Sequence, residues 1–131
     1  MAMMIISDAE GGKKVVAFDV LNALNDNQAQ LIAKILSNSL LVKTALFGED
    51  PNWGRIASTV GASGAKVQED SLVIKFGNIV VYDKGQIIFD KDTEQKAASI
   101  LQNKQFKITC DIGVGQANFT AFGCDLGYDY V

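Results

Sequence analysis

The sequence contains no histidine, and this absence removes several kinds of site together. Histidine is the usual general base near neutral pH, the base of the Ser-His-Asp triad and a frequent zinc ligand. Only two cysteines are present, Cys110 and Cys124, and two thiolates alone do not complete a tetrahedral zinc site. The sequence therefore predicts neither a histidine-dependent active site nor a metal centre.

Positive charge and long apolar segments are also scarce. The chain has 12 Lys and Arg against 15 Asp and Glu, a net charge of −3, so we expect no nucleic-acid partner. No apolar run approaches the roughly 20 residues of a membrane helix, and no membrane association is expected. Residues 1–6 are too short and lack the basic residues of a signal peptide, and they are interpreted as a strand truncated at its start.

The composition favours one compact unit. Hydrophobic residues make up 48% of the 131 residues, enough to bury a core, and no linker or low-complexity segment divides the chain. Residues 1–131 are expected to form a single domain.

Local patterns predict three helices and seven strands. Asn25 with Gln28 indicates a capping box, and Asp92 is the expected cap of the last helix. Gly77-Asn78 predicts a hairpin turn, and residues 83–85 predict a three-residue hairpin loop. The apolar stripe of the first helix is expected at Ala29, Ile32, Ile35, Leu36 and Leu40. In the last helix, the inward residues are expected to be Ala97, Ala98 and Leu101.

The expected order places several strands next to one another, which favours an α+β fold with mixed or antiparallel sheets over a doubly wound α/β fold. The elements are a strand over 14–21, a helix over 25–39, a strand over 42–47, a helix from 50 to about 61, strands over 72–76, 79–82 and 86–89, a helix over 93–103, and strands over 106–112 and 117–122.

The last two strands are expected to form a hairpin with a loop at residues 113–116. Hydrophobic matching then sets Cys110 opposite Phe119 and leaves Cys124 far along the ladder, which argues against a disulfide between the two cysteines. Reduced thiols are typical of a cytoplasmic protein.

Residues 42–55 form the most distinctive segment, because they contain the only proline and the only tryptophan. The apolar run from Val42 to Phe47 predicts a strand. Asp50 is a good N-cap and Pro51 is well placed at the first helical position, so a helix is expected to start there. A helix N-terminus that follows a strand is a common place for a ligand.

Four polar residues of this segment have two interpretations. Glu49, Asp50, Asn52 and Arg55 could bind a ligand. Alternatively, Asp50 caps its helix and Arg55 pairs with a carboxylate, which spacing alone favours. The sequence leaves their roles open.

Four segments, in order, resemble the ornithine acetyltransferase (bifunctional glutamate N-acetyltransferase) family of arginine biosynthesis. The agreement runs from about Met4 to Val131, although Ala9 replaces the family's usual glycine. The segments are SDAEGGKK at 7–14, SNSLLVK at 37–43, KTALFGEDPNWGR at 43–55 and CDLGYDYV at 124–131. The resemblance implies the C-terminal portion of that family's fold.

The resemblance also implies a reaction. The family transfers acetyl from N-acetylornithine to glutamate through an acetyl-threonine intermediate, and some members also use acetyl-CoA; no cofactor is implied. Glu10 matches the family's substrate-binding glutamate, whose carboxylate pairs with a cationic amine of the substrate. Its neighbours Ala9, Gly11 and Gly12 are small and let a ligand approach. Without the resemblance, Glu10 would be interpreted as a solvated turn residue.

Important parts of the family pattern have no match in this chain. The family's enzymes are much longer and cut themselves in two, and neither the nucleophilic threonine nor the oxyanion hole is found here. The resemblance thus implies a C-terminal part of the second cleavage product, with no catalytic residue of its own. Its partners would be the two substrates and the remainder of the enzyme, in an oligomer. The alternative is a non-catalytic binding or assembly module that shares the fold.

Overall fold

The computed structural model describes residues 14–124, which form one six-stranded sheet with four helices. The α+β expectation is confirmed, with four helices in place of the three expected. In chain order the elements are β1 (Val15–Ala23), α2 (Asp26–Asn38), α3 (Leu40–Phe47), α4 (Trp53–Gly61), β2 (Val73–Phe76), β3 (Ile79–Asp83), β4 (Gln86–Ile87), α5 (Lys91–Leu101), β5 (Gln105–Asp111) and β6 (Ala117–Cys124).

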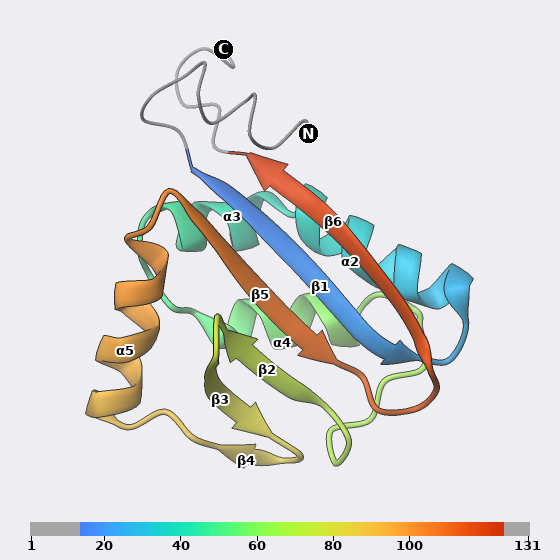
Figure 1. The fold of residues 1–131 in the computed structure, drawn as a ribbon. Helices are drawn as coiled ribbons and strands as arrows, with labels where there is room; N and C mark the ends of the chain where they lie inside the picture. Colours follow the sequence, from blue (N-terminus) through green and yellow to red (C-terminus); the bar gives the residue numbers. More distant parts are fainter. Residues whose placement is uncertain (1–13, 125–131) are drawn as a thin grey trace.

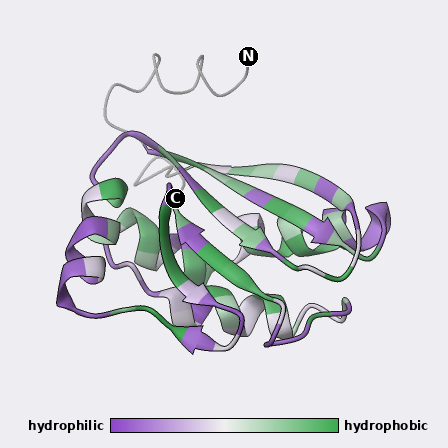
Figure 2. Ribbon diagram, turned by 60° about the horizontal axis from the view of Figure 1, so that its bottom comes forward, coloured by the Kyte–Doolittle hydropathy of each residue, from purple (hydrophilic) through white to green (hydrophobic). Residues whose placement is uncertain are grey.

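The strand order across the sheet is β4-β3-β2-β5-β1-β6. Helices α2, α3 and α4 lie behind the sheet in Figure 1, and α5 lies at its side, near β2 and β3. Figure 2 shows hydrophobic residues along the strands, whereas α5 is largely hydrophilic. Within the described residues, no helix is long and apolar enough to cross a membrane.

Strand β1 alternates between two environments. Val16, Phe18 and Val20 are fully buried and belong to the hydrophobic core. Asp19 points to the other face of the sheet, because successive side chains of a strand alternate. There its carboxylate accepts a hydrogen bond from the Thr120 hydroxyl at 3.1 Å. The alternation therefore assigns one face of β1 to the core, whereas the other face carries Asp19 together with the apolar Val15, Ala17 and Leu21.

The first helix starts as its capping pattern predicts. The Asn25 side chain accepts a hydrogen bond from the Gln28 backbone N–H at 2.9 Å. Of the expected stripe, Ala29, Ile32 and Leu36 are buried. Ile35 is only partly buried, and Leu40, at 70% exposed, is a wrong prediction. The reason is that α2 ends at Asn38, so Leu40 does not continue its face.

The predicted strand over 42–47 is wrong, because this segment is helix α3. The Ser39 side chain caps the helix by accepting a hydrogen bond from the Val42 N–H at 3.2 Å. Val42, Ala45 and Leu46 are buried at helical spacing. A short continuous apolar run has the same appearance in a buried strand and in a buried helix, which explains the error.

The cap of α5 also differs from the prediction. Asp90, two residues before Asp92, accepts a hydrogen bond from the Thr93 N–H at 2.8 Å and is the N-cap. These hydrogen bonds from Thr93 lower the pKa of the Asp90 carboxyl. Ala97 and Leu101 are buried as expected, and Ala98 is partly buried.

The two expected turns of the β2-β3-β4 meander are found, one with a different length. Gly77 has a φ of +62° in the turn between β2 and β3. Asp83 pairs with Gln86, so the next loop has two residues rather than three. Both of them, Lys84 and Gly85, are left-handed, with φ values of 52° and 92°. This backbone suits a two-residue hairpin.

The predicted hairpin between the last two strands is wrong, because β1 lies between β5 and β6. Val20 pairs with Cys110 in the parallel β1-β5 ladder and with Phe119 in the antiparallel β1-β6 ladder. Cys110 and Phe119 thus lie in the same row, as hydrophobic matching suggested, but one strand apart. Hydrophobic matching therefore identified two residues that both pair with Val20, and not two residues that pair with each other.

The two cysteines are nevertheless far apart, as predicted. Cys124 pairs with Val15, whereas Cys110 pairs with Val20. Five residues of strand span about 17 Å, which is too far for a disulfide, and the two cysteines are not bonded to each other.

The loop from β5 to β6 passes closely over the end of β1. The Val114 and Gly115 N–H groups both donate to the Asn22 carbonyl at 3.0 Å. The Asn22 amide donates to the Asp111 carboxylate at 3.0 Å. A Cβ at Gly115 would lie 2.2 Å from the Ala23 carbonyl oxygen, so only glycine fits here without a shift of the backbone.

Because of this close approach, Gly115→Ala tests whether the loop from β5 to β6 packs against the end of β1. We expect the free energy of unfolding to fall by about 2–3 kcal/mol, because the added methyl group must displace the backbone of β1. Urea unfolding measures the change. The matched control is Gly61→Ala, where nothing lies within 4 Å of the added Cβ and a helix gains stability. Equal effects of the two substitutions would contradict the close packing of this loop on the end of β1.

The environment of Cys110 predicts its reactivity. Burial, and to a smaller extent the Asp19 charge, raise the pKa of this thiol to about 12, so little thiolate exists at pH 8. In a Cys124→Ser variant, we expect a thiol reagent at pH 8 to label Cys110 only as the protein unfolds. The unaltered chain should give two thiols in denaturant. Rapid native labelling of Cys110, or no thiols in denaturant, would refute this arrangement.

Candidate functional site

The corner between α3 and α4 contains the most distinctive part of the sequence. We call residues 48–55 the signature corner. The Glu49 N–H donates to the Leu46 carbonyl at 3.1 Å, and the Asp50 N–H donates to the Ala45 carbonyl at 2.8 Å. This pair of bonds is the Schellman motif, in which a left-handed residue ends the helix. Glycine is usual at that position, but here it is Glu49, with a φ of 63°.

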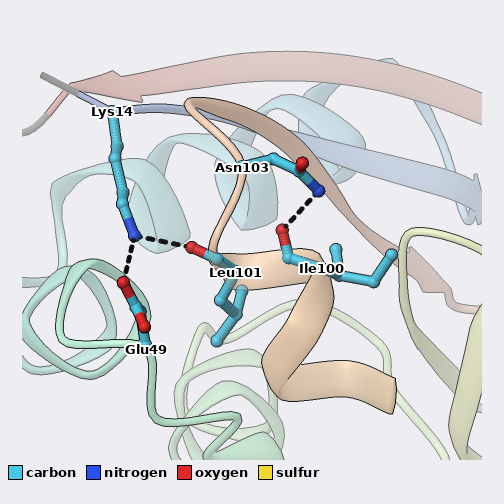
Figure 3. A network of polar contacts seen from close by, with 5 residues as sticks. All are labelled: Lys14, Glu49, Ile100, Leu101 and Asn103. Carbon is cyan, nitrogen blue, oxygen red and sulfur yellow. Dashed lines mark hydrogen bonds and ion pairs between the residues drawn. The ribbon is translucent and has the colours of Figure 1, made fainter. Parts of the chain in front are cut away.

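The Glu49 side chain contacts a lysine from the start of β1. Lys14 Nζ lies 3.0 Å from the Glu49 carboxylate and 2.6 Å from the Leu101 carbonyl oxygen. Figure 3 shows both contacts, together with the end of α5. The Lys14 side chain is only 15% exposed, whereas that of Glu49 is 46% exposed. We call Lys14, Glu49 and the Leu101 carbonyl the Lys14 cluster.

The cluster also satisfies the end of α5. Leu101 is the last residue of this helix, whose carbonyls point outward and carry partial negative charge. The last turn of α5 has no basic residue of its own. Lys14 supplies that charge from a segment 87 residues earlier in the chain. One ammonium group therefore joins the start of β1, the signature corner and the end of α5.

The cap of α4 is Asn52, and the prediction that Asp50 caps this helix is wrong. Asn52 accepts a hydrogen bond from the Arg55 N–H at 3.2 Å through its side chain. A tight turn explains the shift, since the Asn52 N–H donates to the Asp50 carbonyl at 2.7 Å and delays the helix. The Arg55 guanidinium donates to the Leu41 carbonyl at 3.0 Å. Among residues 14–124, Arg55 is thus bonded to a carbonyl rather than to a carboxylate.

The aromatic residue of the signature corner packs against the meander. Trp53 stacks on Tyr82, with ring centroids 5.6 Å apart and an interplanar angle of 25°. Phe89 lies edge-on to Trp53, with ring centroids 6.5 Å apart and an interplanar angle of 67°. Beside Tyr82 is a hollow of about 340 Å³, which Glu69 also lines. Trp53 therefore fixes α4 against β3 and the segment before α5.

The structure thus gives structural contacts to three of the four polar residues whose roles were open. Glu49 binds Lys14, Asn52 caps α4 and Arg55 holds the first turn of α3. Asp50 has an exposed side chain. The arrangement defines a rigid corner, and the polar groups within it position backbone segments relative to one another.

The residue matched to substrate binding, Glu10, lies outside the described residues, as do the truncated strand expected at 1–6 and the segment after Cys124. Sequence reasoning did not select Lys14, although it ends the SDAEGGKK segment. A lysine directly before a buried strand was the available signal. Among the side chains of residues 14–124, no group of three or more acidic, cysteine or histidine residues could hold a metal ion.

Comparison with known proteins gives consistent matches over the whole chain. The family model described as "ArgJ family" matches residues 1–131. The "Arginine biosynthesis bifunctional protein ArgJ" of Wolinella succinogenes is 56% identical over 131 residues, covering 100% of this chain and 33% of the relative. The "Glutamate N-acetyltransferase" of Methanopyrus kandleri is 44% identical over 135 residues, covering 100% of this chain and 34% of the relative.

A solved structure shows the same fold. The crystal structure of the arginine biosynthesis bifunctional protein argJ from Bacillus halodurans matches with a TM-score of 0.83 and 38% identity. The match covers 98% of this chain and 60% of that chain. The chain spans about one third of the length of the curated relatives, and it aligns with them over its whole length. The chain belongs to the ArgJ family.

Proposed function

We propose that this chain is the C-terminal part of a glutamate N-acetyltransferase that moves acetyl from N-acetylornithine to glutamate in arginine biosynthesis. The observation that carries the proposal is 56% identity to the Wolinella ArgJ protein over the whole chain. The Methanopyrus relative, whose name states glutamate N-acetylation, supports it. Acetyl-CoA is a further acetyl donor within this proposal. We place the protein in the cytoplasm as part of an oligomer.

Within this function, the chain supplies binding and support rather than the nucleophile. Covalent transfer in this proposal uses a terminal threonine activated by its own amine, opposite an oxyanion hole. None of the threonines of this sequence matches the family's nucleophilic threonine, so we place that residue outside this chain. Both catalytic elements would come from the remainder of the protein, which is therefore the chain's main partner. No cofactor takes part in the proposed reaction.

Glu10 is the proposed substrate-binding residue of this chain. Its carboxylate would pair with the cationic amine of N-acetylornithine, a charge-assisted contact. Glu10 precedes Lys14 by four residues in the sequence. Four residues of extended chain span at most about 14 Å, which limits how far the two can be separated. The Lys14 cluster, at the start of β1, is therefore the described region most relevant to Glu10.

If the nucleophile and the oxyanion hole lie in the remainder of the protein, this chain alone should fold but should be inactive. We propose that residues 1–131 form one domain, so the purified chain should unfold cooperatively in a circular dichroism melt. It should not transfer acetyl from N-acetylornithine to glutamate above a heat-killed control. The complete protein that contains this chain should do so in the same assay. Activity of the isolated chain would refute the proposal that the nucleophile lies outside it. An inactive complete protein would favour the alternative of a non-catalytic binding or assembly module.

Glu10→Gln in the complete protein tests substrate binding. The substitution keeps shape and hydrogen bonding but removes the charge, so kcat/KM for N-acetylornithine should fall about ten- to a hundredfold. Self-cleavage should remain normal, because no substrate amine takes part in it. Glu94→Gln, at an exposed position on α5, is the matched control and should change nothing. An unchanged kcat/KM would show that Glu10 is a solvated turn residue that does not bind substrate. Failed cleavage would indicate a structural role.

A further inference from the structure

We propose that the hollow beside Tyr82 is a binding site for a small organic cation with an apolar body and a primary ammonium group. The site lies between α4, the loop that follows this helix, and β3. It goes beyond the acetyltransferase function and does not depend on it. The residues that line the hollow are Ala57, Gly61, Val67, Glu69, Leu72 and Tyr82.

The size of the hollow suits a small organic molecule. Its volume is about 340 Å³, within the range of about 300–1,000 Å³ that is usual for ligand pockets. An apolar cavity of about 150 Å³ already holds benzene. The hollow therefore has room for an aromatic or aliphatic body with a short arm.

Helix α4 leaves this space open because its contribution to the lining is small. Ala57 and Gly61 are four residues apart, so they lie on the same side of the helix. Glycine is a poor helix former, yet the backbone of Gly61 is not left-handed. Among residues 14–124, no atom lies within 4 Å of a Cβ added at Gly61. Neither backbone geometry nor close packing thus requires glycine here, and its effect is to leave the hollow unfilled.

The meander contributes a buried hydroxyl group with incomplete hydrogen bonding. Tyr82 is only 8% exposed, and its ring is held by the stack on Trp53. Within the described residues, its hydroxyl has one hydrogen-bond partner, the Glu69 carbonyl at 3.5 Å. Well-formed O–H···O bonds measure about 2.5–3.0 Å, and a buried tyrosine hydroxyl usually finds a good partner. A ligand in the hollow would supply that partner.

The polar groups of the lining favour a cation. Glu69 is the one charged residue among the six, and its side chain is exposed at the edge of the protein surface. Its carboxylate and carbonyl oxygens are acceptors, and the Tyr82 hydroxyl can also accept. A primary ammonium group offers three donors and the complementary charge, and its hydrogen bonds to a carboxylate are charge-assisted. The other lining residues are apolar or lack a side chain, and they suit a hydrocarbon body.

Calorimetric titration of the complete protein with phenethylammonium tests the site. This cation combines a phenyl ring with a two-carbon arm and a primary ammonium group. We expect saturable binding of one cation per chain. Phenethyl alcohol and phenylpropionate carry the same ring without the positive charge, and they should bind about tenfold more weakly or not at all.

Three variants locate the bound cation. Gly61→Leu should weaken binding by about tenfold or more, because the new side chain fills the hollow. Ala62→Leu is the matched control, since Ala62 is exposed at the same helix end and does not line the hollow. It should bind like the unaltered protein. Glu69→Gln should weaken binding of the cation about tenfold and leave that of phenethyl alcohol unchanged.

Other results would overturn the proposal. No saturable binding to the complete protein would exclude the site. Binding that persists undiminished in Gly61→Leu would place the cation elsewhere in the protein. Equal affinities for the cation and the alcohol would contradict selection by charge. Should Gly61→Leu fail to fold in a circular dichroism melt, Glu69→Gln decides alone, and an unchanged affinity of that variant for the cation would refute the site.

Discussion

The position of β1 between a parallel and an antiparallel neighbour is the constraint on which the rest of the structure depends. Both of its edges are paired, and one of its faces packs into the core through Val16, Phe18 and Val20. Parallel pairing with β5 requires a long connection, and the intervening helices and meander provide it. The close loop over Asn22 fixes the far end of the strand, and Lys14 fixes the near end.

The signature corner shows how a short motif can specify an arrangement of distant segments. Its residues end α3, cap α4, stack on the meander and bind the lysine that directly precedes β1. A corner with so many fixed contacts has few alternative conformations. Binding residues are often placed on such rigidly supported segments. In the proposed enzyme, this chain would hold the substrate-binding segment in place, and the remainder of the protein would supply the groups that transfer the acetyl group.

Some features of the chain followed from the sequence alone, because they depend on neighbours only a few residues apart. The Asn25 cap, the Gly77 turn and the burial of Ala29, Ile32 and Leu36 on α2 are of this kind, and the structure confirms each of them. The family was also recognisable, since four short segments kept their order. The charge of −3 and the lack of histidine remain the grounds for expecting neither a nucleic-acid partner nor histidine chemistry.

Other features were decided only by the tertiary structure. An apolar run from Val42 to Phe47 suits a strand or a helix equally, and the contacts of α3 with α2 and α4 select the helix. The hairpin of β5 and β6 failed because sequence adjacency favours pairing neighbours, whereas burial of β1 required it to lie between them. The Lys14 cluster joins residues up to 87 positions apart, and no local pattern reports such a contact. Interactions between residues close in sequence determine the caps and turns. The packing of the whole chain determines which strands pair and which distant side chains meet.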